Sequence, residues 1–190
     1  MPNHAIFLDR DGTLNEDPGY LGNPELVKLL PEVGEALSGL KKAGFKLIVI
    51  SNQSGIARGL LTKENVDSVN QRINELLKPF NAEIDHFLYC PFHPDFSKKE
   101  DCICRKPSPK LVFDAAEKYN IDLSASYFIG DSLVDIECGE NAGIKTILVK
   151  TGYGVETFSI LQKQNKFPTF VAENIFIAYK FVKNDYCGVL

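Results

Sequence analysis

The 190-residue sequence has no long apolar run and no cluster of basic residues. Its apolar stretches are much shorter than the roughly 18 to 20 residues of a membrane-spanning helix, so we expect no membrane partner. Lys and Arg are scattered along a chain whose net charge is −4, which disfavours a nucleic-acid partner. No apolar leader precedes the first predicted strand, and we therefore expect a cytoplasmic protein.

Internal repeats and low-complexity segments are also missing. Hydrophobic residues make up 44% of the chain and charged residues 24%, which is the composition of a compact protein and not of a disordered one. At this length the chain can bury one sizeable core. We therefore predict a single domain over residues 1–190, and we expect a monomer.

Short apolar runs, each as long as a buried strand, recur at residues 5–8, 45–50, 86–90, 126–130, 145–149 and, more weakly, 169–172. Amphipathic segments of helical length lie between them, at 31–43 and 63–77. Ser108 and Pro109 are typical of the N-cap and first residue of another helix. This alternation predicts an α/β fold: a doubly wound, mostly parallel, Rossmann-like sheet with helices on both faces.

The segment after Thr151 is the least informative part of the chain. We expect it to form covering helices around a last strand. Its aromatic residues are assigned to the core, namely Tyr153, Phe158, Phe176 and Tyr179.

Polar residues follow several of the predicted strands. Asp9 and Asp11 come after the first strand, Ser51 after the second and Asp131 after the fourth. The carboxyl ends of parallel strands form the ligand crevice of such sheets. Residues 9 and 11 should point to one side and Arg10 to the other, because side chains alternate along an extended backbone.

Three carboxylates at one sheet edge would repel one another unless a hard cation lay between them. We therefore predict a Mg²⁺ site there. A solvated turn carboxylate is the plainer alternative for Asp9, since Asp11 and Gly12 are common turn residues.

Four stretches, FLDRDGT, ISNQSG, CRKPSP and FIGDSLVD, occur in an order that resembles the haloacid dehalogenase superfamily of phosphohydrolases. The resemblance covers about the first 150 residues. It implies that Asp9 is the nucleophile and that Asp11 is the general acid and base. It also implies that Mg²⁺ is held by Asp9, the main-chain carbonyl of Asp11 and Asp131.

In the same resemblance, Ser51 and Lys106 bind the phosphoryl oxygens, where they would stabilise transition-state charge. A strand-end cap for Ser51 and a solvated loop charge for Lys106 are the alternatives. Asp135 is either a supporting acid of the site or a residue on an exposed helix face.

A second metal is predicted from the cysteines. Cys90, His93, Cys102 and Cys104 have a spacing suited to tetrahedral Zn²⁺, which would pin the loop that delivers Arg105 and Lys106. A buried Cys90 at a strand end and a disulfide are the alternatives.

No insertion long enough for a separate cap domain lies between Gly12 and Phe45 or between Ser54 and Arg105. Around GTLNEDPGYLGN, SNQSGIARG and CRKPSPK the chain is similar to the heptose-1,7-bisphosphate and histidinol-phosphate phosphatases. The similarity implies a small phosphorylated sugar as substrate, with contacts from Asp17, Tyr20, Asn52, Gln53, Ser54 and Arg105. Arg105 could pair with a second phosphate.

This chain departs from the narrower family at two positions. Phe92 stands where the family usually has its ligand histidine, and Ser132 stands where a lysine is common. The leading prediction is a 7-phosphatase of a heptose 1,7-bisphosphate, in the synthesis of surface polysaccharide precursors.

The first alternative is a histidinol-phosphate phosphatase, and a second is a 3′-end nucleic-acid phosphatase, which would want a basic groove. The third is a non-catalytic phospho-acceptor domain. Asp11 argues against the third, because a phospho-acceptor needs no general acid.

Overall fold

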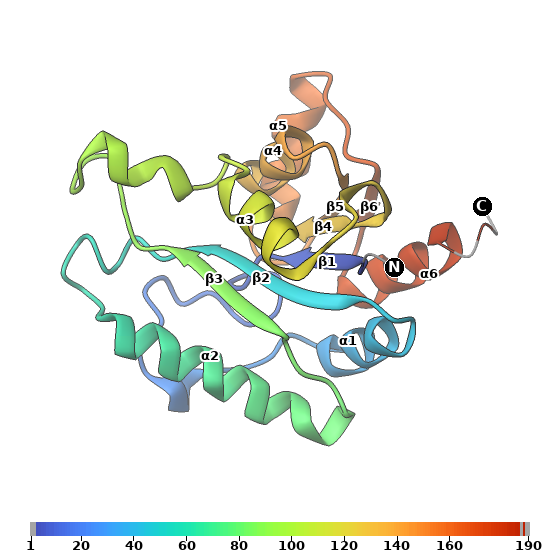
Figure 1. The fold of residues 1–190 in the computed structure, drawn as a ribbon, viewed down its shortest axis with the longest axis horizontal. Coiled ribbons are helices and arrows are strands. Elements are labelled where there is room, and N and C mark those ends of the chain that lie inside the picture. The colour runs from blue at the N-terminus through green and yellow to red at the C-terminus, as the bar shows by residue number, and fades with distance from the viewer. Residues whose placement is uncertain (1–2, 187, 189–190) are drawn as a thin grey trace.

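A computed structural model describes residues 3–186 and 188 of the chain. Its six strands form one parallel sheet in the order β3-β2-β1-β4-β5-β6 (Figure 1). The strands are β1 (Ala5–Leu8), β2 (Lys46–Asn52), β3 (His86–Cys90), β4 (Tyr127–Gly130), β5 (Lys145–Val149) and β6 (Phe170–Ala172). The predicted parallel α/β sheet is confirmed.

Helices cover both faces of the sheet, as predicted (Figure 1). The helices are α1 (Val33–Lys42), α2 (Lys63–Leu77), α3 (Lys110–Tyr119), α4 (Leu133–Asn141), α5 (Gly154–Lys163) and α6 (Ile175–Tyr186). Helices α1, α2 and α6 pack on one face, and α3, α4 and α5 on the other. Among the described residues, no helix has the length and apolar character needed to cross a membrane.

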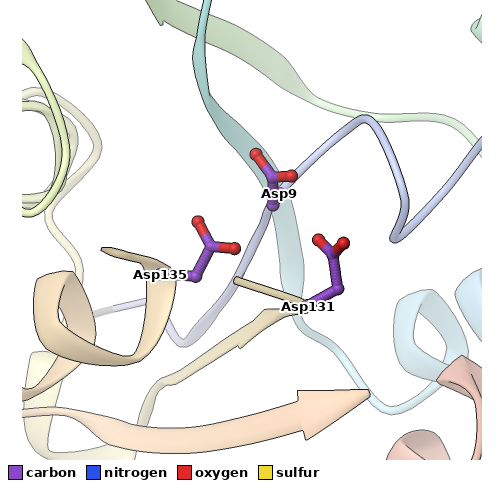
Figure 2. A group of neighbouring side chains, drawn as sticks. All are labelled: Asp9, Asp131 and Asp135. Carbon is purple, nitrogen blue, oxygen red and sulfur yellow. The ribbon is translucent and has the colours of Figure 1, made fainter. Parts of the chain in front are cut away.

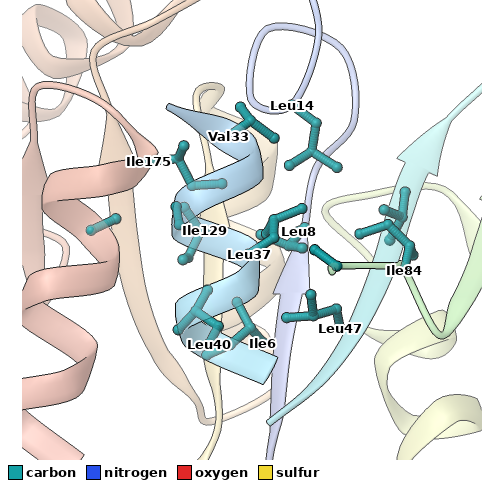
Figure 3. Close-up of a cluster of buried hydrophobic side chains, with 14 of the residues drawn as sticks. Ile6, Leu8, Leu14, Val33, Leu37, Leu40, Leu47, Ile84, Ile129 and Ile175 are labelled. Atoms are coloured by element: carbon teal, nitrogen blue, oxygen red, sulfur yellow. The ribbon is translucent and has the colours of Figure 1, made fainter. Parts of the chain in front are cut away.

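The central strands are buried on both sides, which explains their continuous apolar sequence. Ile6 and Leu8 of β1 point into the core under α1, whereas Ala5 and Phe7 point into the core under α3. Figure 3 shows the first of these cores, where side chains of α1 pack between the sheet and α6. The alternation of side chains along each strand therefore divides one sheet between two cores.

The helix limits agree with the sequence except at two starts. The segment predicted at 31–43 becomes helical at Val33, after Glu32 in a left-handed conformation, and ends before Gly44, whose φ is 90°. The N-cap of α3 is Pro109 and not Ser108, so that prediction was wrong by one residue. The Ser108 hydroxyl still accepts a hydrogen bond from the Lys110 amide at 3.4 Å.

The strand order reverses between β1 and β4, since β2 lies outside β1 and β5 outside β4. Asp9 directly follows β1, and Asp131 directly follows β4. Ligands of doubly wound sheets bind outside the carboxyl ends of the strands at such a point. The topology therefore brings these two carboxylates to the place where a ligand is expected.

Candidate active site

An open cleft lies at this edge of the sheet. Ten of the predicted catalytic, metal-binding and substrate-binding residues line it: Asp9, Asp11, Asp17, Tyr20, Ser51, Asn52, Gln53, Ser54, Lys106 and Asp131. They come from the loop after β1, the end of β2, the loop before α3 and the end of β4. The fold thus gathers side chains that are more than a hundred positions apart in the chain.

Three carboxylates lie close together at this edge of the sheet (Figure 2). One oxygen each of Asp9, Asp131 and Asp135 lies within 4.8 Å of the others. Burial raises the pKa of Asp9 well above its usual value, and the charges of Asp135 and Asp131 add to this effect against the opposing Lys106. Burial and the charge of Asp135 likewise raise the pKa of Asp131 to about 6. These carboxylates therefore lack part of the positive charge that their ionised forms need.

Asp135 belongs to this group, and the alternative of an exposed helix face is wrong. Its side chain is fully buried. The Ser132 amide and hydroxyl donate to one of its oxygens at 2.9 and 2.6 Å, which caps the start of α4. The other oxygen lies 2.6 Å from the ammonium of Lys106. Ser132, where the related family often has lysine, thus serves the helix cap and adds no charge to the cleft.

Lys106 is the cation at the centre of the site, and the alternative of a solvated loop charge is wrong. Its ammonium lies 2.5 Å from Oδ1 of Asp9 and donates to the Ile50 carbonyl at 2.7 Å. Burial lowers the pKa of Lys106, but Asp135 and Asp9 outweigh that effect and raise it overall. The Asn52 side chain holds the Lys106 backbone through two hydrogen bonds of 3.0 and 3.2 Å. Asn52 therefore positions the lysine as well as lining the cleft.

Asp11 is held by donors on several sides. Its carboxylate accepts hydrogen bonds from Asn15 at 2.9 Å and from Gln53 at 3.0 Å. Arg10 was expected to point away from it, but the buried guanidinium turns back and approaches Asp11 to 2.8 Å. Backbone alternation could not predict this contact, because a long side chain can bend back around its own backbone.

The donor set fits a divalent cation with oxygen ligands. Among the described residues, the site holds four carboxylates, Asp9, Asp11, Asp131 and Asp135, of which Arg10 pairs with Asp11 and Lys106 with Asp9 and Asp135. With all four ionised, two negative charges remain after these two cations are counted. Mg²⁺ would balance that charge.

The surroundings of Asp131 make one half of this cation site rigid. Its oxygens accept from the Thr13 hydroxyl at 3.1 Å and the Tyr153 amide at 2.8 Å. Gly12 and Gly152 lie against it so closely that a Cβ on either residue would overlap Oδ2. The carboxylate is therefore held in one orientation, as a metal ligand requires.

The predicted phosphate and substrate contacts differ in how they lie relative to the cleft. Ser51 is buried at the cleft wall, with Gln53 Nε2 at 3.3 Å from its hydroxyl. Asp17 accepts a hydrogen bond from the Gly19 amide at 2.8 Å within its own loop, and Tyr20 is half exposed; both residues line the cleft. Arg105 is not among the lining residues. Its guanidinium donates to the Phe92 carbonyl at 3.3 Å, and burial lowers its pKa.

The four predicted zinc ligands are not assembled in the structure. Cys90 and Cys104 form a disulfide, which was the alternative, and Cys102 is a free, half-buried thiol. His93 points its Nε2 towards Arg58, with 3.1 Å between that atom and Nη2. The disulfide nevertheless ties the end of β3 to the residue that precedes Arg105.

Tyr153 was assigned to the core, and that prediction was wrong. Its side chain is 59% exposed and lines the cleft, next to the backbone amide that binds Asp131. Phe158, Phe176 and Tyr179 do pack against the cores. The signal in the sequence was the position of Tyr153 between two glycines just after an apolar strand, where other site residues also lie.

Comparisons with known proteins agree on one family. Residues 103–176 match the family model Hydrolase_like, described as "HAD-hyrolase-like". The chain is 43% identical over 183 residues to the D-glycero-D-manno-heptose-1,7-bisphosphate 7-phosphatase of Chlorobaculum tepidum, covering 92% of this chain and 91% of that protein. It is 41% identical to the D-glycero-beta-D-manno-heptose-1,7-bisphosphate 7-phosphatase of Escherichia coli (strain K12), covering 78% of this chain and 80% of that one.

Solved structures give the same picture. The D,D-heptose 1,7-bisphosphate phosphatase from B. bronchiseptica, complexed with magnesium and phosphate, superposes with a TM-score of 0.85 at 31% identity. The match covers 96% of this chain and 99% of that one. The corresponding enzyme from Burkholderia thailandensis has a TM-score of 0.70 at 26% identity and covers 94% and 97%.

Proposed function

Because this chain belongs to the D-glycero-D-manno-heptose-1,7-bisphosphate 7-phosphatases, within the haloacid dehalogenase-like hydrolases, we propose that it removes the 7-phosphate of a D-glycero-D-manno-heptose 1,7-bisphosphate. It is a phosphatase that hydrolyses phosphoric monoesters, and Mg²⁺ is its metal. Its product would feed the synthesis of surface polysaccharide precursors. The observation that carries the proposal is the position of Asp9, whose carboxylate faces the cleft beside the Lys106 ammonium.

In the first half of the reaction, a carboxylate oxygen of Asp9 attacks phosphorus and the bond from phosphorus to the sugar oxygen breaks. Asp11, two positions along and lining the same cleft, gives its proton to the leaving oxygen. The products of this step are the free sugar hydroxyl and an aspartyl phosphate on Asp9.

In the second half, water attacks the phosphorus of the aspartyl phosphate. Asp11, now ionised, takes the proton of that water, and the Asp9 carboxylate leaves with inorganic phosphate released. One carboxyl group thus serves both steps, a role that fits two acidic residues placed two positions apart just after β1.

Ser51 and Lys106 bind the phosphoryl oxygens in this proposal, because both line the cleft beside Asp9. The cation would be held by Asp9, the main-chain carbonyl of Asp11 and Asp131. When bound, Mg²⁺ offsets the repulsion between an anionic nucleophile and an anionic phosphate. Asp135 would act through Lys106, which it holds at 2.6 Å.

Sugar recognition is assigned to the loops around the cleft, since residues 3–186 form no separate cap domain over it. Asp17, Tyr20, Asn52, Gln53 and Ser54 lie where a sugar joined to the reacting phosphate would extend. Arg105 precedes Lys106 in the chain but does not line the cleft, and its guanidinium donates to the Phe92 carbonyl. For Arg105 to hold the second phosphate, its side chain would leave the Phe92 carbonyl and turn towards the cleft.

The zinc proposal concerns the reduced chain, because thiolates and not disulfides ligate Zn²⁺. With the bond from Cys90 to Cys104 reduced, these two residues, Cys102 and His93 would hold a structural zinc ion. That ion would then tie the loop to the end of β3, as the disulfide does.

A zinc determination on protein purified under reducing conditions tests this. We expect about one zinc ion per chain, and a loss of zinc in Cys102→Ser. The control is Cys138→Ser, since Cys138 is a buried cysteine of α4 whose Sγ donates to the Ser108 carbonyl at 3.3 Å and which is not one of the predicted ligands. A reduced wild-type protein without zinc would overturn the zinc proposal and leave the phosphatase proposal intact.

The substrate is tested by catalytic efficiency with Mg²⁺ on a panel of phosphate monoesters. The panel contains D-glycero-D-manno-heptose 1,7-bisphosphate in both anomers, other sugar phosphates and histidinol phosphate. We expect the highest kcat/KM for one heptose 1,7-bisphosphate anomer. A higher value for histidinol phosphate would replace the proposed substrate by the first alternative.

A monomeric state, a cytoplasmic location and a single domain over residues 1–190 stay predictions.

A further inference from the structure

Arg10 is a buried charge that the proposed reaction does not use. Its side chain is 1% exposed, although the residue lies two positions after the end of β1 and beside an open cleft. Burying a guanidinium is costly unless it is paired, and an apolar side chain of similar size often stabilises a fold equally well. The position of Arg10 therefore calls for a role other than packing.

The hydrogen bonds of the Arg10 guanidinium go to two residues, Asp11 and Asn70. Nε lies 3.2 and 3.1 Å from the two oxygens of the Asp11 carboxylate, and Nη2 lies 2.8 Å from one of them. This is a two-pronged contact, which fixes direction as well as distance. The remaining nitrogen, Nη1, donates to Oδ1 of Asn70 at 3.1 Å.

Asn70 makes this arrangement rigid. It is a buried residue of α2, sixty positions away in the sequence, and belongs to an element that begins with a capping box. The guanidinium is thus held between a helix on one side and Asp11 on the other. The Asp11 side chain is 17% exposed at the cleft, where Asn15 and Gln53 also donate to its carboxylate.

We propose that Arg10 is a positioning residue, which holds the Asp11 carboxyl group at the point in the cleft from which it serves the leaving oxygen. The inference rests on the proposed function. A carboxyl group with two rotatable bonds can turn towards solvent in an open cleft, and a displacement of about 1 Å can cost on the order of 10² in rate. The fork of Arg10, anchored on Asn70, removes that freedom.

The inference predicts a loss that depends on the leaving group. An alkoxide leaving group, as in a sugar phosphate, needs a proton from Asp11, whereas p-nitrophenolate leaves without one. A defect in the position of Asp11 should therefore slow phosphorylation of Asp9 by the sugar ester and spare the p-nitrophenyl ester. A general loss of structure would slow both.

The experiment is a rapid-quench, single-turnover measurement of Asp9 phosphorylation with both esters and Mg²⁺. The variants are Arg10→Lys, which keeps the charge but loses the fork, Arg10→Met, and Asn70→Leu, which removes the anchor. For the two Arg10 variants we expect a loss of about 10²-fold with the sugar ester, a nearly unchanged rate with the p-nitrophenyl ester, and a smaller loss of the same kind for Asn70→Leu. Asp11→Asn gives the reference pattern.

The matched control is Arg72→Met. Arg72 is also a residue of α2, but it is partly exposed and pairs with Glu75 at 3.2 Å. The rates of Asp9 phosphorylation by the sugar ester and by the p-nitrophenyl ester should therefore stay unchanged. Equal losses with both esters in the Arg10 variants, or no loss with the sugar ester, would overturn the proposal. Failure of every Arg10 and Asn70 variant to fold would assign Arg10 to stability and overturn it too.

The wild-type rates separate this inference from the proposed function. Preference for another alkyl phosphate would reject the heptose substrate, and the Arg10 test would then use that preferred ester. Inactivity of the wild type on every ester would reject the proposed function and the inference with it.

Discussion

The ammonium of Lys106 lies 2.5 Å from a carboxylate oxygen of Asp9, although the two residues are 97 positions apart. The same ammonium lies 2.6 Å from Asp135. One buried cation thus serves both the proposed nucleophile and a carboxylate that caps α4. We therefore expect Lys106 to contribute both to folding stability and to catalysis, and we expect variants to separate the two contributions.

Lys106→Met should lower both properties. Removing the cation leaves the buried carboxylates of Asp9 and Asp135 unpaired, and we expect the free energy of unfolding to fall by about 3 to 5 kcal/mol. Loss of a donor to the phosphoryl group should lower kcat by about 10² to 10³. Urea unfolding and steady-state kinetics measure the two effects.

The double variant Lys106→Met/Asp135→Asn is the control for this prediction. It removes one of the unpaired charges, so stability should partly return while activity stays low. Recovery of activity together with stability would mean that Lys106 acts only through the fold.

Asp9→Asn should abolish turnover and stabilise the metal-free protein. Burial and neighbouring carboxylates raise the pKa of Asp9, so its ionised form is disfavoured in the folded chain. An amide has no such cost. We expect an activity loss of at least about 10³-fold, no acid-stable phosphoryl label on the protein, and a higher Tm in the presence of a chelator. A Tm below that of the wild type would contradict the electrostatic argument.

The stability of the metal-free protein should depend on pH through Asp131. Its pKa is about 6 in the folded chain and 3.8 as the ordinary value, so the folded state binds a proton more tightly than the unfolded state. The resulting stabilisation is complete below about pH 4 and is lost as the pH rises through about 6. The loss is of the order of 3 kcal/mol.

Urea unfolding with a chelator, at several pH values, measures this effect as the difference between the wild type and Asp131→Asn. Mg²⁺ should remove the difference in pH dependence, because a bound cation favours the ionised carboxylate. A difference between wild type and variant that does not change with pH would show that Asp131 is not perturbed.

Gly152→Ala and Gly143→Ala form a matched pair. Both glycines have positive φ, +52° and +71°, so alanine should cost each about 1 kcal/mol in backbone strain. A Cβ at 152 would also overlap the Asp131 carboxylate, whereas at 143 it would meet open space. We expect weaker Mg²⁺ activation only in Gly152→Ala, measured as the Mg²⁺ concentration for half-maximal activity. If both variants needed the same Mg²⁺ concentration for half-maximal activity, Gly152 would have no role in holding the metal ligand Asp131.

The spacing of apolar residues was enough to predict the sheet and its covering helices. Runs such as AIFL and KTILV have the length and apolar composition of strands buried on both sides, and the segments between them have helical periodicity. Because ligands bind at the carboxyl ends of parallel strands, the sequence also predicts that Asp9, Ser51 and Asp131 lie together at one sheet edge.

The sequence could not determine the contacts that depend on the direction of a long side chain or on the packing of distant loops. Arg10 bends back onto Asp11, Asp135 is buried against Lys106, Tyr153 faces the cleft, and Cys90 bonds to Cys104.

Local patterns fix which residues leave a strand at the same edge, because the backbone geometry of strands is regular. Tertiary structure alone decides which of those side chains touch, because contact depends on rotamers and on neighbours from elsewhere in the chain. The residue types of this site were therefore determined by the sequence, and the charge network among them by the fold.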